Sequence, residues 1–205
     1  MVKKTLKQRI VEASVELFQQ DGYHNVTVDR IVEYIGASKG GFYHNFKSKE
    51  ELLYEIHDVF ISYVIQQSQD AYDKYGTPIT RLCAMLQTLT QVFDMYQAHI
   101  TIFYEESRSL SEEYSEIIHK KRDHYRDILQ KVIAEGQETK VFRTELPCTI
   151  VTMAIVGMIN WTYKWFKQSG PLTMEQITDV FTDMVLRAIV TEQAMDEAKQ
   201  FMIKG

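Results

Sequence analysis

Residues 27–49 read TVDRIVEYIGASKGGFYHNFKSK, and this stretch predicts two short helices joined by a glycine turn. Thr27 is suited to cap the first helix, whose apolar residues recur at helical spacing. These apolar residues are Val28, Ile31, Val32 and Ile35. Gly36 ends the first helix, and Ser38 can cap a second one that continues to about Asn45. Two short helices joined by a tight turn predict a helix-turn-helix.

The second short helix begins with Lys39-Gly40-Gly41, a costly composition for a helix. Glycine costs roughly 1 kcal/mol relative to alanine in a helix interior, so a purely structural helix would gain from replacing both. Close approach of the backbone to another molecule explains the pair. The DNA major groove admits one α-helix, and we predict that Lys39, Gly40 and Gly41 face DNA. The alternative is an ordinary three-helix cap with exposed polar side chains.

Polar side chains near the glycines are suited to hold the DNA backbone. Phe42 and Phe46 are four residues apart and share a helix face, which we assign to the core. Tyr43 and His44 therefore point away from the core, and both side chains can donate to phosphate oxygens. Lys49 lies beside the first turn of the next helix, where free backbone N–H groups attract anions. The predicted phosphate contacts are Thr27, Tyr43, His44 and Lys49.

Positive charge is concentrated at the N-terminus of an acidic chain. The 205 residues carry a net charge of −5, but residues 1–49 hold eight Lys and Arg against five acids, which leaves +3 here and −8 elsewhere. The eight cations are Lys3, Lys4, Lys7, Arg9, Arg30, Lys39, Lys47 and Lys49. A small basic module on an acidic body is expected when only one end of a protein meets phosphates.

The run TVDRIVEYIGASKGGFYHNFKSKEELL, residues 27–53, resembles the DNA-binding domain of TetR-family repressors. The shared features are the G-[AV]-S turn, a small pair before an aromatic residue, the F-Y-x-x-F core and the K-x-K-E-x-L that follows. The resemblance implies base contacts by Lys39 and Gly41 and phosphate contacts by Thr27, Tyr43, His44 and Lys49. Family members usually carry threonine or serine where this chain has Gly41. The missing hydroxyl leaves Lys39, with Ser38, as the main candidate for direct readout.

Long helices are predicted for the rest of the chain, which has only 9 Gly and 3 Pro in 205 residues. Capping boxes at Ser48–Glu51 and Thr173–Gln176 begin two of them, and Thr77-Pro78 begins another. The other expected segments are a helix to about Met95, one from Ala98 to about Glu106, one from Ser111 that Gly136 ends, and one from Leu146 to about Gln168. We predict an all-α protein of about nine helices, with a helix-turn-helix domain at 1–48 and a ligand-binding and dimerisation domain at 49–205.

The last two predicted helices carry more apolar residues than one small core needs. These residues are Met153, Gly157 and Trp161 on the earlier helix, and Phe181, Met184, Val185, Ala188 and Ile189 on the later one. A single helix-turn-helix reads few base pairs, and pairing two copies on a palindrome solves this problem. We predict a homodimer through these helices on double-stranded palindromic DNA; the alternative is packing within one chain.

Aromatic residues and methionines in the middle of the chain form either a core or a ligand pocket. Residues 157–171, GMINWTYKWFKQSGP, resemble the C-terminal signature of a TetR subgroup. This subgroup contains FadR- and KstR-type regulators, which respond to acyl-CoA thioesters. This resemblance implies a small hydrophobic effector, with acyl-CoA the favoured one, in an apolar tunnel. The candidate ligand residues are Phe93, Phe103, Tyr104, Met153, Gly157, Asn160 and Trp161. The Asn160 amide would bond either the ligand or a backbone carbonyl.

Basic residues of the middle region have two interpretations. Lys120, Lys121, Arg122 and Arg126 could meet CoA phosphates or form a solvated face paired with nearby acids. Glu116-x-x-His119 has the spacing of a di-iron site, but no second copy exists, and no nucleotide-binding or hydrolase motif is present. We therefore expect neither an enzyme nor a cofactor.

Cysteine usage and hydropathy indicate the cellular compartment in which the protein is expected. Cys83 and Cys148 lie in apolar helical contexts, as small core residues do, and match no disulfide or zinc spacing. The N-terminus has no apolar segment of a signal peptide, and the longest apolar stretch is far shorter than the roughly 20 residues of a membrane span. We expect a cytoplasmic protein without membrane contact.

The combined prediction is a TetR-like, ligand-responsive repressor of fatty-acid or lipid metabolism genes that acyl-CoA releases from DNA. One alternative is a repressor of an efflux or detoxification gene that senses an aromatic or cationic drug. An alternative from another class is a helical metal- or lipid-binding protein.

Overall fold

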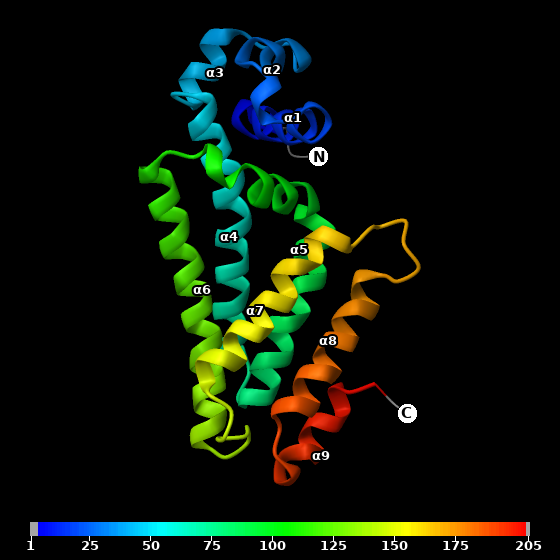
Figure 1. Ribbon diagram of the computed structural model, residues 1–205. Helices are drawn as coiled ribbons and strands as arrows, with labels where there is room; N and C mark the ends of the chain where they lie inside the picture. The colour runs from blue at the N-terminus through cyan, green and yellow to red at the C-terminus, as the bar shows by residue number, and fades with distance from the viewer. Residues whose placement is uncertain (1–3, 204–205) are drawn as a thin grey trace. The chain divides into compact units, whose positions relative to one another are not determined.

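The computed structural model describes residues 4–203, apart from the side chain of Leu89, and within them the protein is all-helical (Figure 1). The described residues contain nine α-helices, which confirms the predicted fold class. They are α1 (Leu6–Asp21), α2 (Val28–Tyr34), α3 (Lys39–Asn45), α4 (Lys49–Lys74), α5 (Pro78–Glu106), α6 (Glu112–Glu138), α7 (Cys148–Trp165), α8 (Met174–Ile189) and α9 (Met195–Ala198). Short 3₁₀ turns lie at Tyr23–Asn25, Ser107–Ser109, Glu192–Ala194 and Lys199–Phe201.

The chain divides into two compact units. The N-terminal unit comprises the chain up to Ser62 together with Tyr96–Lys120. The C-terminal unit comprises Tyr63–Met95 together with the chain from Lys121 onward. This division cuts α4, α5 and α6, so each of these helices contributes to both units. The domain boundary predicted after residue 48 remains a prediction.

The core of the N-terminal unit joins α1, α2 and α3 to the start of α4 and the later part of α5. Its buried residues include Ile10, Leu17, Phe18, Val26, Ile31, Phe42, Phe46, Leu52, Ile56 and Ile102. Thr5 and Gln8 form a reciprocal capping box at the start of α1, and Gly22, with a φ of 79°, follows its end. The helix-turn-helix is therefore held by one apolar core, with helix starts fixed by local hydrogen bonds.

The predicted helices before and after residue 97 form one helical segment, α5. Thr77 Oγ1 accepts a hydrogen bond from the Thr80 N–H at 3.2 Å, which confirms the predicted cap before Pro78. The segment is broken at Tyr96, whose backbone angles are φ −129° and ψ 17°. This break coincides with the boundary between the two units. The sequence pattern thus located the break, although the chain remains helical on both sides of it.

Gly136 lies inside α6 and does not end it, which corrects the predicted boundary. The helix continues to Glu138, and Lys140 then adopts a φ of 59°, so that Phe142 returns to pack on the helix. A Cβ atom on Gly136 would lie 2.0 Å from Cδ2 of Phe142, which is fully buried. Close packing of an aromatic ring, and not helix termination, accounts for this glycine.

The last helices differ from the prediction at their ends. Thr173 and Gln176 form the predicted capping box of α8. The preceding helix, α7, stops at Trp165 and not near Gln168, since Phe166 has an extended backbone with φ −68° and ψ 132°. The chain after Ile189 also folds into a short helix, α9, which the sequence pattern did not predict.

Candidate DNA-binding site

Local hydrogen bonds build the helix-turn-helix as the sequence predicts. Thr27 Oγ1 accepts a hydrogen bond from the Arg30 N–H at 3.2 Å, and Ser38 Oγ accepts one from the Gly41 N–H at 3.1 Å. Between the two helices, Gly36 has a φ of 63° in the left-handed region, which glycine adopts without steric cost. The predicted caps and the predicted turn are confirmed.

The short helix α3 turns its aromatic face inward. Phe42 and Phe46 are buried, and their ring centroids lie 5.7 Å apart. Lys39, Tyr43 and His44 are exposed on the outer side, with 51% of Tyr43 accessible to solvent. The predicted division between a core face and an outer face is confirmed. Contact of the outer face with DNA stays a prediction.

The two glycines of α3 have different surroundings. Gly40 is exposed, and a Cβ atom there would approach one side chain, that of Ser38, at 3.9 Å. Gly41 is half-buried, and a Cβ atom there would lie 3.0 Å from Cδ2 of Leu6 on α1. Packing against α1 accounts for Gly41, whereas the exposed backbone at Gly40 is accessible to another molecule.

The ammonium group of Lys39 is paired with Asp29 of α2. Lys39 Nζ lies 2.8 Å from Oδ1 and 3.0 Å from Oδ2 of this carboxylate. The hydrogen bond to Asp29, followed by the charge of the same group, raises the pKa of Lys39. Both side chains are more than half exposed, so the pair adds little to stability. Lys39, the main candidate for base readout, is thus charged and accessible, and Asp29 on the neighbouring helix holds its ammonium group in place.

Lys49 is occupied inside the N-terminal unit. Its Nζ donates to the backbone carbonyls of Tyr23 and Val26 at 2.8 and 2.9 Å and lies 4.2 Å from the centre of the Tyr23 ring. Burial lowers the pKa of Lys49, and the charge of Glu106 opposes this shift. Lys49 therefore fastens the turn before α2 to the start of α4. An ammonium group has three N–H donors, so at most one is left for a phosphate.

Lys47 is an exposed cation of the basic N-terminus that is not among the predicted DNA contacts. It lies between α3 and Ser48, whose hydroxyl accepts from the Glu51 N–H at 3.0 Å and so caps α4. The Lys47 backbone N–H donates to the Glu51 carboxylate. Within the described part of the chain its ammonium group has no ion pair or hydrogen bond. The K-x-K spacing after Phe46 was the signal that could have identified it.

Most other cations of this region are paired with neighbours in the same unit. The pairs are Lys4 with Glu12 at 2.8 Å, Lys7 with Glu55 at 2.6 Å and Arg30 with Asp21 at 2.7 Å, and Arg9 donates to the carbonyl of Ile35. Lys3 lies outside the described residues. With Lys39, four of the eight cations of the N-terminus are therefore paired with acids of the same unit. This arrangement favours DNA binding through a few selected contacts over general attraction to phosphate.

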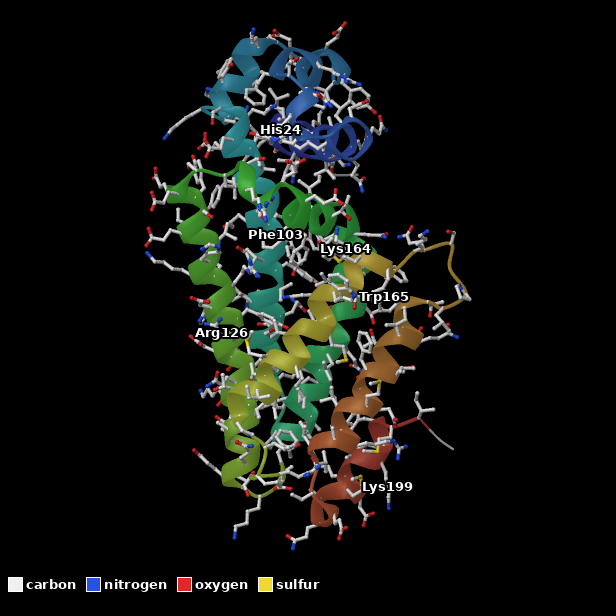
Figure 2. The ribbon with its side chains drawn as sticks, in the orientation of Figure 1. His24, Phe103, Arg126, Lys164, Trp165 and Lys199 are labelled. Atoms are coloured by element: carbon white, nitrogen blue, oxygen red, sulfur yellow. The ribbon has the colours of Figure 1, made fainter. Side chains whose placement is uncertain are left out.

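The candidate ligand residues are distributed over both units. Phe103 and Tyr104 belong to the N-terminal unit, and the others belong to the C-terminal unit. Phe103, labelled in Figure 2, is buried with its ring centroid 4.9 Å from that of His57 and 5.4 Å from that of Phe60. Phe93 is also buried and contacts the Phe166 ring edge-on at 5.6 Å. Tyr104 and Asn160 are half-buried.

Three candidate ligand residues lie on an exposed face of α7. Met153 and Trp161 are 48% and 63% exposed, and a Cβ atom on Gly157 would have no neighbour within 4 Å. Ile150 and Trp165, the latter labelled at the end of α7 in Figure 2, extend this face. Neither residue is among the predicted ligand or pairing residues, although both fall at the same helical spacing. In the single chain, this side of α7 therefore presents large apolar side chains to solvent.

The helix α8 contributes a smaller exposed apolar strip beside α7. The rings of Trp165 and Phe181 lie 6.4 Å apart, and α7 and α8 run side by side in the C-terminal unit (Figure 1). Val180 and Met184 are 40% and 56% exposed. Of the residues predicted for pairing, Met184 and Ala188 are exposed and Phe181 is half-buried, whereas Val185 and Ile189 are buried. The predicted apolar stripe is thus divided between the core of this unit and its surface.

Comparison with known families identifies the chain. Residues 10–56 match the model for bacterial regulatory proteins of the tetR family. Residues 75–189 match the model for the tetracyclin repressor-like C-terminal domain, which alone spans more than half of the chain. This protein belongs to the TetR family. The resemblance of its helix-turn-helix to that of TetR regulators is confirmed.

Relatives of this TetR-family protein align over most of their length. The transcriptional repressor KstR2 of Mycolicibacterium smegmatis is 26% identical over 192 residues, which cover 91% of this chain and 92% of that one. The structure of PfmR from Thermus thermophilus has 28% identity and a TM-score of 0.82, over 87% of this chain and 97% of that one. AibR in complex with isovaleryl coenzyme A and operator DNA has 26% identity and a TM-score of 0.75, over 88% and 96%.

Family membership defines the general role of the protein. As a TetR-type protein it is a ligand-responsive, DNA-binding transcriptional repressor and not an enzyme. The described residues include no group of three or more His, Cys, Asp or Glu that could hold a metal ion. Within the same residues, every helix is too short or too polar to span a membrane.

Proposed function

We propose that this TetR-type repressor binds palindromic DNA as a homodimer and that an acyl-CoA thioester releases it from genes of fatty-acid or lipid metabolism. The observation that carries the DNA part is the outer face of α3. Lys39, Gly40, Tyr43 and His44 are accessible there, while the aromatic residues of the same helix are buried. A short helix with small residues at its start and polar groups along one side suits the major groove.

Dimerisation through α7 and α8 is the second element of this proposal. Met153, Trp161 and Met184 are each about half exposed or more, at 48%, 63% and 56%. Large apolar side chains exposed on two neighbouring helices are costly in water and are stabilised when a second copy covers them. A twofold pair of reading heads requires a palindromic operator, in which each half-site meets one copy.

The effector is proposed from relatives and from the chemistry of the body. AibR, a similar protein of known structure, binds isovaleryl coenzyme A together with operator DNA. Each unit of this chain has buried aromatic side chains of the kind that can surround an acyl chain, such as Phe103 in the N-terminal unit and Phe93 in the C-terminal unit. The basic residues of α6 are weaker candidates for CoA phosphates, since Lys120 pairs with Glu116 at 2.8 Å and Arg126 with Asp123 at 2.9 Å.

Release from DNA requires that the effector prefer the conformation that does not bind DNA. The test measures fluorescence anisotropy of a labelled operator duplex, obtained by selection from random DNA with the full-length protein. Isovaleryl-CoA, octanoyl-CoA and palmitoyl-CoA are then titrated against octanoate, palmitate and free CoA as controls. We expect release by at least one thioester and by none of the controls. Release by an aromatic cation such as tetraphenylphosphonium, and by no thioester, would favour an efflux regulator and contradict the acyl-CoA assignment.

A further inference from the structure

The ion pair between Lys39 and Asp29 places a donor and an acceptor side by side on the outer face of the helix-turn-helix. Lys39 is the first residue of α3, Asp29 is the second residue of α2, and Nζ lies 2.8 Å from Oδ1. Their side chains are 57% and 67% exposed. An ammonium group has three N–H donors, and a carboxylate has about four lone-pair sites. Both groups therefore keep free hydrogen-bonding capacity beside each other.

A G·C base pair presents the complementary arrangement in the major groove. Guanine offers its O6 and N7 as acceptors, and cytosine offers its N4 amino group as a donor. O6 and N4 are joined by a Watson–Crick hydrogen bond, so they are separated by about 2.9 Å, the usual length of such a bond. This separation matches the distance from Lys39 Nζ to Asp29 Oδ1. Lys39 can donate to O6 while Asp29 accepts from N4 of the same base pair.

We propose that Lys39 and Asp29 together read one G·C base pair in each half-site, with Lys39 on guanine and Asp29 on cytosine. The inference rests on the proposed function, because it requires α3 in the major groove. An A·T pair offers the adenine amino group where guanine has O6, and the thymine O4 where cytosine has its amino group. Lys39, a donor, would then face another donor, and Asp29, an acceptor, would face another acceptor. An inverted C·G pair exchanges the donor and the acceptor, so the reading is directional.

Asp29 has a second effect, which concerns DNA of the wrong sequence. Its carboxylate competes for the Lys39 ammonium group and repels nearby phosphates. DNA without the correct base pair offers phosphates but no partner for the carboxylate, so the ion pair opposes non-specific binding. Removal of Asp29 therefore has two consequences: affinity for random DNA rises, and discrimination at one base pair falls.

The test measures binding of the full-length protein to a panel of duplexes in which each half-site base pair of the selected operator is changed symmetrically. For the wild type we expect one position at which changing G·C to A·T or to C·G weakens binding by roughly tenfold or more. In Asp29→Ala and in Lys39→Ala this penalty should fall to about threefold or less, because one of the two groups that read the pair is missing. The double variant should show no further loss of discrimination at that position, since the two residues act as one reader.

Asp21→Ala is the matched control. Asp21 pairs with Arg30 at 2.7 Å in the same unit, so its removal changes the charge equally and frees a cation that the inference does not use. This control should raise affinity for all duplexes without changing the preference at any single position. Thermal melting followed by circular dichroism verifies that each variant is folded.

Three outcomes would overturn the inference. They are an operator with no position that requires G·C, a G·C preference that survives in Asp29→Ala, and an equal loss of that preference in Asp21→Ala. Failure of the proposed function is a distinct outcome. In that case the wild-type protein enriches no duplex from random DNA and does not shift the mobility of any palindrome.

Discussion

The outer face of the helix-turn-helix and the exposed face of α7 and α8 differ in the kind of side chain that they present to water. On the first face the exposed groups are polar, and a cation such as Lys39 is paired with an acid at 2.8 Å. On the second face large apolar side chains are exposed, among them Trp161 at 63% and Met184 at 56%. The first surface is compatible with water, whereas the second is stabilised when it leaves water.

This difference indicates two kinds of association. A polar face makes hydrogen bonds and ionic contacts with DNA in place of contacts with water and counterions, so its binding is reversible and depends on salt. An apolar face gains roughly 25 cal/mol for each Å² removed from water, so its association is persistent and depends little on salt. One chain thus combines a surface suited to reversible DNA binding with a surface suited to stable pairing.

The largest expected effect comes from placing a charge on the apolar face. Trp161→Glu should dissociate the proposed dimer, because the substitution occurs twice in a twofold interface and loss of a central aromatic residue costs roughly 2–4 kcal/mol. Sedimentation equilibrium should show a monomer at concentrations where the wild type is dimeric. Gln87→Glu, at an exposed position of α5, introduces the same charge and should leave the dimer intact. A dimeric Trp161→Glu variant would remove this face of α7 from the interface.

The second effect concerns the interior of the N-terminal unit, where polar groups are also buried. His57 is fully buried, and within the described residues neither of its ring nitrogens makes a hydrogen bond of ordinary geometry. Burial lowers the pKa of His57 to about 4; the backbone of Ile102 opposes this shift and the charge of His99 adds to it. The unfolded chain therefore binds a proton more readily than the folded one, with an unfolded pKa near 6.5.

The sign of this effect is a loss of stability as the pH falls. The contribution of His57 is fully present above its unfolded pKa of about 6.5 and is lost progressively down to about pH 4, by an amount on the order of 3 kcal/mol. Urea denaturation at pH 7 and pH 4.5 measures the loss. His57→Leu should remove much of the pH dependence, whereas His124→Leu, at an exposed position, should retain it. Equal pH dependence in both variants would contradict the role of His57.

The third prediction tests whether Lys49 acts in folding or in DNA binding. Lys49→Met keeps the apolar stem but removes two hydrogen bonds to backbone carbonyls, so it should destabilise the protein by roughly 1–3 kcal/mol. The urea midpoint reports this change, and Lys47→Met, which alters an exposed lysine two residues earlier, should leave the midpoint unchanged. If Lys49→Met has wild-type stability and instead binds every DNA sequence more weakly, Lys49 is a phosphate contact and not a structural tether.

The smallest effect is expected for Lys47. The substitution Lys47→Met should weaken binding to all DNA sequences by a similar factor, because it removes one exposed phosphate contact. It should also reduce the slope of log K against log salt by about 0.9 for each copy in contact with DNA. Anisotropy titrations over a range of salt concentrations measure the slope. Lys199→Ala removes the same charge from the C-terminal unit and should change neither quantity. A change confined to particular sequences would show that Lys47 contacts bases.

Local features of this protein were predictable from the sequence because they depend on residues three or four positions apart. The hydroxyl groups of Thr27 and Ser38 each meet a backbone N–H three residues later, and Thr173 does the same for Gln176. Helical spacing also separates the buried Phe42 from the exposed Tyr43. These choices follow from bond geometry within one turn of helix, so neighbouring residues determine them.

Contacts between distant residues decided the rest, and no local pattern contains them. The Lys39 ammonium group meets Asp29, ten residues away, and Lys49 reaches the carbonyls of Tyr23 and Val26, 26 and 23 residues away. Gly136 reads as a helix end in the sequence, but the returning Phe142 ring makes it an interior position. The sequence alone determined that a helix-turn-helix forms and which side of α3 faces outward. The tertiary structure decided which lysines are available on that side, because pairing depends on distances that only the folded chain establishes.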